Sequence, residues 1–135
     1  MTEKTSWTAG GILAISGGYW QSFALHAAVK LGIFTILGAD RLSAAGVAAR
    51  LDASERGVAP LLNALSAMGL VVKKGEIYKN TEESKRLLTK KAPGYIGHII
   101  MHHHHLGESW GRLDESVRTG KPVRVWEEKD EERES

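Results

Sequence analysis

The sequence predicts a mainly α-helical fold: a winged helix-turn-helix with a small β-hairpin, plus additional N- and C-terminal dimerisation helices. Three observations lead to this prediction. Apolar residues recur at helical spacing through residues 55–68, two β-prone runs flanking a glycine turn follow at residues 70–78, and a long apolar segment precedes both at residues 7–37. A length of 135 residues with 42% hydrophobic content is enough for one domain with a single core.

Residues 1–40 are expected to form the N-terminal dimerisation helices. The segment from Trp7 to Leu37 is apolar and is interrupted by Gly10-Gly11 and Gly17-Gly18, and its second half repeats apolar residues at helical spacing until Gly38. We therefore predict two helices with a break near Gly17-Gly18.

This N-terminal segment carries more large apolar side chains than a short helix can bury against one small domain. A second copy of the chain is the natural cover, since aromatic residues commonly anchor such interfaces, although an ordinary intrachain core is the simpler alternative. The candidate interface residues are Trp7, Ile12, Ile15, Tyr19, Trp20 and Phe23.

Residues 41–80 are expected to form the winged-helix segment. Ser43 can cap a short helix, and residues 52–54 supply a turn and a second cap. The next helix, from Glu55 to Met68, has its apolar residues at spacings of three and four and is followed by Gly69, which favours termination. The β-prone runs 70–72 and 77–78 then flank a glycine-containing turn, which predicts a hairpin.

Residues 81–125 are expected to form C-terminal helices of the same domain, and residues 126–135 an acidic linker or tail. Thr81 can cap a helix through Leu88, Pro93-Gly94 breaks the chain, and residues 95–117 indicate one long or broken helix. Beyond Trp126 the sequence has no apolar face to bury.

Composition excludes several classes of protein. The absence of cysteine excludes disulfides, thiolate metal sites and cysteine nucleophiles. Residues 1–120 carry 14 basic and 10 acidic residues, a smaller excess than a nucleic-acid binder usually shows. No signal peptide or membrane-length apolar run is present, so a cytoplasmic protein without a membrane partner is expected.

A run of histidines, residues 102–105 preceded by His98, is the most unusual local feature. His98 and His102 lie one helical turn apart and could share a metal ion, but consecutive residues on a helix point about 100° apart, so the run cannot converge on one ion. A packed or pocket-lining surface is the favoured interpretation. The glycine pairs also lack the spacing of a dinucleotide-binding loop, and we predict no metal, cofactor or catalytic residue in this chain.

A winged helix raises the alternative of a DNA-binding transcription regulator. Helix 55–68, however, offers few groups for bases or phosphates on its outer face, and only Lys73, Lys74 and Lys79 on the hairpin form a basic cluster. No nucleic-acid partner is predicted in the preferred interpretation. The outer-face residues are Glu55, Arg56, Ala59, Pro60, Asn63, Ser66 and Ala67.

Taken together, residues 10–125 resemble the N-terminal dimerisation and winged-helix region of the S-adenosylmethionine-dependent O-methyltransferases, which include plant phenolic, acetylserotonin and bacterial polyketide enzymes. The order and spacing of several short segments carry the resemblance. They are residues 18–20, 27–37, 42–51, 61–72, 78–81 and 107–123.

The resemblance implies a homodimer whose N-terminal regions intertwine, followed in a complete enzyme by a Rossmann-like domain that binds S-adenosylmethionine and carries the catalytic base. This sequence contains no acidic-x-Gly-x-Gly-x-Gly loop, so the isolated chain is expected to be inactive. That pattern is compatible with a truncated chain, a fragment and a solitary dimerisation module alike. The resemblance further implies that residues near Glu108 line a small-molecule acceptor pocket, with His102, His105, Leu106 and Trp110 as candidates.

Overall fold

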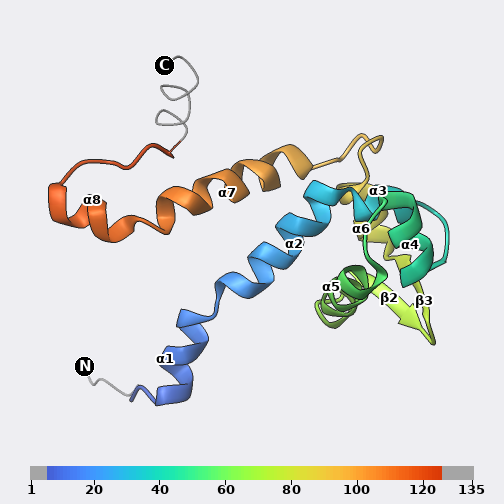
Figure 1. Cartoon of the computed structure of the whole chain (residues 1–135), viewed down its shortest axis with the longest axis horizontal. Helices are drawn as coiled ribbons and strands as arrows, with labels where there is room; N and C mark the ends of the chain where they lie inside the picture. Colours follow the sequence, from blue (N-terminus) through green and yellow to red (C-terminus); the bar gives the residue numbers. More distant parts are fainter. Residues whose placement is uncertain (1–5, 126–135) are drawn as a thin grey trace. The chain divides into compact units, whose positions relative to one another are not determined.

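The computed structural model describes residues 6–125 of the chain, which divides into two compact units, residues 1–97 and 98–135 (Figure 1). The described part is mainly helical, as predicted. Unit 1 holds α1 (Ala9–Ser16), α2 (Tyr19–Leu31), α3 (Ile33–Leu37), β1 (Leu42–Ser43), α4 (Ala44–Leu51), α5 (Glu55–Ala67), β2 (Val71–Lys74), β3 (Ile77–Asn80) and α6 (Glu82–Leu88). Helix α7 (Gly97–Trp110) starts at the last residue of unit 1 and is followed in unit 2 by α8 (Leu113–Thr119).

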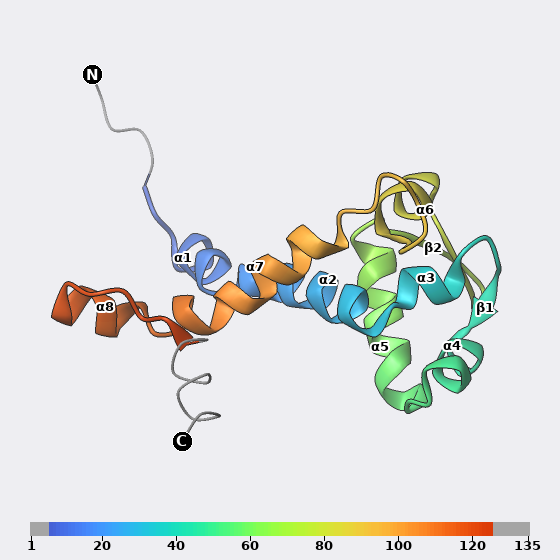
Figure 2. The ribbon, with the colours of Figure 1, turned by 90° about the horizontal axis from the view of Figure 1, so that it is seen from above.

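The core of unit 1 lies between α3, α4, α5 and the small sheet, which gather in one part of the unit (Figures 1 and 2). Helix α5 supplies Leu62 and Leu65, which are completely buried, in agreement with its predicted apolar spacing. Helix α3 contributes three residues to the same core. They are Ile33, Phe34 and Leu37.

Two predicted helix caps are confirmed. The Ser43 hydroxyl accepts a hydrogen bond from the Gly46 amide at the start of α4, and Thr81 Oγ1 accepts one from the Ser84 amide at the start of α6. Ser54 precedes α5 as expected, although its side chain makes no capping hydrogen bond.

The predicted hairpin is confirmed, because β2 and β3 pair antiparallel around the glycine turn, and a third strand that was not predicted joins the sheet. Strand β3 lies in the centre, with β2 paired antiparallel on one side and β1 on the other. Strand β1 is only two residues long, and Leu42 pairs with Tyr78 far along the chain. Such a short, non-local pairing leaves no periodic pattern in the sequence.

The prediction of two N-terminal helices was wrong in number, since residues 6–40 contain three. The break near Gly17-Gly18 separates α1 from α2 as expected, but Gly32 adds a second break between α2 and α3. Gly32 has a φ of 75°, a left-handed conformation that ends α2. The helical spacing of apolar residues continues across Gly32, so the sequence pattern does not reveal the break between α2 and α3.

The C-terminal stretch predicted as one long or broken helix is broken, with α7 ending at Trp110 and α8 beginning at Leu113. Gly120 ends α8 in a left-handed conformation. The acidic segment predicted for residues 126–135 lies outside the described residues. Within residues 6–125, the structure contains no helix long and apolar enough to cross a membrane.

Candidate functional site

The N-terminal helices of unit 1 carry an exposed apolar surface without charge. All six candidate interface residues are exposed, with Trp7, Ile15 and Trp20 at 64–68%. Residues 5–29 contain no Asp, Glu, Lys or Arg, and α1 buries none of its residues. The cores of protein interfaces are similarly poor in charge and rich in aromatic side chains. We refer to the six residues as the apolar face.

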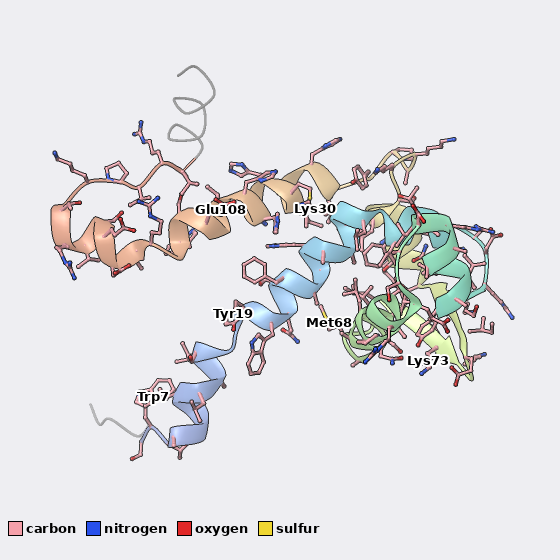
Figure 3. All side chains as sticks on the ribbon, viewed as in Figure 1. Trp7, Tyr19, Lys30, Met68, Lys73 and Glu108 are labelled. Atoms are coloured by element: carbon pink, nitrogen blue, oxygen red, sulfur yellow. The ribbon has the colours of Figure 1, made fainter. Side chains whose placement is uncertain are left out.

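Three of the four aromatic residues of the apolar face, Tyr19, Trp20 and Phe23, form a connected row along α2. The rings of Tyr19 and Trp20 lie 6.0 Å apart edge to face, and those of Tyr19 and Phe23 lie 5.8 Å apart in the same manner. Phe23 in turn contacts the ring of His26, which is buried. Figure 3 shows the side chains of Trp7 and Tyr19 standing out from the ribbon. These ring contacts restrict the side chains before a partner binds, so the side chains lose little conformational entropy on binding.

Unit 2 contains a small pocket of about 180 Å³ between the end of α7 and the segment after α8. Two of the four predicted acceptor-lining residues, Leu106 and Trp110, line it. The pocket surface is mostly apolar, and sequence reasoning missed the rest of its lining. The other lining residues are Ser109, Leu113, Ser116, Pro122 and Val123.

Ser109 adds a polar group to this apolar pocket. Its hydroxyl is buried and has no hydrogen-bond partner among the described residues. A buried hydroxyl without a partner costs free energy, which a ligand that donates or accepts a hydrogen bond there would recover. An apolar hollow with one unsatisfied polar atom is the usual composition of a small-molecule site.

The other two predicted lining residues, His102 and His105, are exposed on α7 and do not line this pocket. They lie one helical turn before Leu106 and Ser109, respectively. Neighbouring rings in the run are tilted against each other, with 6.5 Å between His102 and His103. Across residues 6–125 no three His, Asp or Glu side chains are arranged to hold a metal ion.

The lysines of the hairpin do not form one patch. Lys73 Nζ donates to Asn63 Oδ1 at 3.0 Å and lies 5.4 Å from the centre of the Tyr78 ring, on the side of the sheet that faces α5. Lys74 and Lys79 instead line a hollow on the opposite side. Because Lys73 lies on the other side of the sheet, the three lysines cannot contact the same DNA backbone together.

Comparison with known proteins gives consistent matches. The family model of the O-methyltransferase dimerisation domain matches residues 13–90. The tetracenomycin polyketide synthesis 8-O-methyl transferase TcmO of Streptomyces glaucescens is 35% identical over 83% of this chain and 34% of its own length. The chain spans about a third of the length of the curated relatives it matches.

Solved structures agree with this result. An O-methyltransferase family protein from Burkholderia thailandensis matches with a TM-score of 0.78 and 35% identity over 88% of this chain and 36% of that protein. Human N-acetylserotonin methyltransferase in complex with SAM matches with a TM-score of 0.75 and 29% identity, over 89% of this chain and 37% of that protein.

Proposed function

The chain belongs to the O-methyltransferase dimerisation-domain family, and on that premise we propose that it is the homodimerising, acceptor-binding N-terminal region of an S-adenosylmethionine-dependent O-methyltransferase. In this proposal the methyl donor and the catalytic base belong to a catalytic domain outside residues 1–135. The chain by itself then transfers no methyl group. It supplies the dimer contact and part of the acceptor site.

The observation that carries the proposal is the apolar face. Six large apolar side chains without a neighbouring charge remain exposed on one short segment, and leaving such a surface in water is unfavourable. A second copy offers the same uncharged face, so two copies can cover each other about a twofold axis. The family name supports a dimer contact in this region, since the match begins at Leu13.

The acceptor role rests on the pocket of unit 2. Leu106 and Trp110 provide apolar contact, and the unpartnered Ser109 hydroxyl provides a hydrogen-bonding group for a small molecule. A volume of about 180 Å³ is small for a complete ligand site. We therefore assign to this chain one wall of the acceptor site, with His102 and His105 extending it along α7.

The choice of methyl donor is supported by similar proteins. The human structure was determined with SAM, and another similar structure, 32% identical, is described as PigF with SAH. The proposal retains the winged-helix interpretation of residues 41–80 and a cytoplasmic location. It includes no nucleic-acid or membrane partner, and the separation of Lys73 from Lys74 and Lys79 supports the first of these choices.

Co-expression of two differently tagged copies of the chain tests self-association. If the proposal is correct and the two copies are expressed equally, purification through one tag recovers the other tag at about half the amount of the captured tag, because dimers form at random between the two copies. A Trp20→Asp copy provides the matched control and should be recovered poorly, since it places a charge in the apolar face. Recovery of the captured tag alone would refute homodimerisation.

A further inference from the structure

A second hollow, of about 380 Å³, lies on the outer face of the three-stranded sheet, opposite the face that packs on the helices. Its lining alternates between two aliphatic and three basic side chains. They are Val72, Ile77, Arg41, Lys74 and Lys79. All five belong to unit 1, and none of them lies in the apolar face or in the pocket of unit 2.

The strand register places these charges close to one another. Lys79 pairs with Val72, and Lys74 pairs with Ile77, so charged and aliphatic side chains alternate across β2 and β3. Extending the pairing of Leu42 with Tyr78 by one residue brings Arg41 opposite Lys79. Like charges at opposite positions of an antiparallel pair destabilise a sheet unless a counter-charge is present.

No carboxylate of the described residues lines the hollow. Asp40 Oδ2 lies 3.5 Å from Arg50 Nη1 and Glu82 Oε1 lies 2.8 Å from Lys85 Nζ, so these two acidic groups already have partners. Glu76 is exposed in the turn that joins β2 to β3 and does not line the hollow. The hydrogen bond from Lys85 lowers the pKa of Glu82, and the charge of Lys79 makes only a smaller contribution. The three cations around the hollow therefore lack an ion-pair partner within residues 6–125.

From this arrangement we propose that the hollow is a binding site for a small organic anion with an aromatic or aliphatic body, such as an aryl carboxylate. Val72 and Ile77 contact the apolar body, and Arg41, Lys74 and Lys79 pair with the anionic group. The volume lies within the roughly 300–1,000 Å³ of small-molecule pockets. DNA is the less suitable occupant, because Lys73 is turned to the opposite face.

Titration of the isotope-labelled full chain with 2-naphthoate, followed by amide chemical shifts, tests the proposal. We expect the largest shifts at residues 72, 74, 77 and 79, and weaker binding at higher salt. The matched neutral probe is 2-naphthalenemethanol, which keeps the ring system and lacks the charge. It should bind about tenfold more weakly, since it forms no charge-assisted hydrogen bonds.

Two variants complete the test. The Arg41→Gln and Lys79→Gln double variant should lose about tenfold in naphthoate affinity and keep its melting temperature, because removing opposed like charges does not harm the sheet. Lys73→Gln, on the other face of the same hairpin, should leave the affinity unchanged.

Four results would overturn the proposal. The first is that the largest amide chemical-shift changes occur on α1 and α2 or around Ser109. The second is equal affinity for the charged and neutral probes, and the third is unaltered binding by the double variant. Displacement of naphthoate from these residues by a short DNA duplex at low micromolar concentration would also overturn it, in favour of a nucleic-acid site.

Discussion

Asn80 shows how one side chain can hold the core of unit 1 together. It is buried, and its Nδ2 donates to the carbonyl oxygens of Phe34 at 2.8 Å and Gly38 at 3.0 Å. Both carbonyls lie in the last turn of α3 and its cap, where the Phe34 carbonyl also accepts from the Gly38 amide and the Gly38 carbonyl lies beyond the helical hydrogen bonds. The amide therefore ties β3 to α3, across more than forty residues of sequence.

Replacing this residue should be costly. Asn80→Ala removes both hydrogen bonds and leaves the Gly38 carbonyl without a donor among the described residues, whereas the Phe34 carbonyl keeps the Gly38 amide. It is expected to lower the free energy of unfolding by about 1–3 kcal/mol. Asn63→Ala serves as the control, because Asn63 is exposed and water can replace it as the acceptor for Tyr78 and Lys73, so a loss below about 1 kcal/mol is expected. Urea denaturation measures the free energy of unfolding of both variants. Equal losses for Asn80→Ala and Asn63→Ala would contradict the role of Asn80 in holding β3 to α3.

Ser109 gives the second prediction at this scale. Ser109→Ala removes a buried hydroxyl without a partner and should raise the free energy of unfolding by roughly 1 kcal/mol. Ser116→Ala, which changes a helical serine of the same pocket, controls for the gain in helix propensity. Thermal melts of both variants give the comparison. If Ser109→Ala raises the free energy of unfolding by less than Ser116→Ala does, the Ser109 hydroxyl is not an unsatisfied polar group that a ligand could satisfy.

At the scale of elements, replacing glycine by alanine is expected to have opposite effects on stability at Gly32 and at Gly57. Gly32 has a φ of 75°, so Gly32→Ala should destabilise unit 1 by about 1 kcal/mol. Gly57 lies within α5, and an added Cβ there would meet nothing within 4 Å, so Gly57→Ala should stabilise by about 0.5–1 kcal/mol. Melting temperatures that shift in the same direction for both would be inconsistent with the two helix assignments.

The elements that sequence predicted correctly have local signals. The caps at Ser43 and Thr81 lie next to the helices they start, and the apolar spacing of α5 is read within one segment. Strand β1 has no such signal, because it exists only through its pairing with β3. Ser109 was missed for a related reason, since it lines its pocket together with Pro122 and Val123, which follow α8 and are distant from it in sequence.

The apolar face on α1 and α2 also yields a prediction. Trp20→Asp places a charge among six exposed apolar residues and should weaken self-association by about 30-fold or more, the usual effect of losing an aromatic anchor. Circular dichroism should remain unchanged, because Trp20 lies outside the core. Ile77→Glu alters an exposed apolar residue elsewhere in unit 1 and should leave association intact. Sedimentation equilibrium compares the self-association of the Trp20→Asp and Ile77→Glu variants. Equal weakening by both would exclude a specific role for the apolar face in self-association.

At the scale of the whole molecule, we propose that the two roles of the chain belong to different segments. Residues 13–90 match the dimerisation domain, and the apolar face begins just before that range and continues into it. The pocket with Ser109 lies in the other unit, beyond the matched range. Association and acceptor binding are thus assigned to different parts of the chain, which makes the two roles separable by mutation.

We propose that the chain forms a stable homodimer through the apolar face. Light scattering of the purified chain across a hundredfold dilution measures it directly. We expect a mass near twice the 14.7 kDa of one chain at every concentration, because an interface of this composition resembles a domain core. A folded species with the mass of a single chain throughout the dilution series would contradict it.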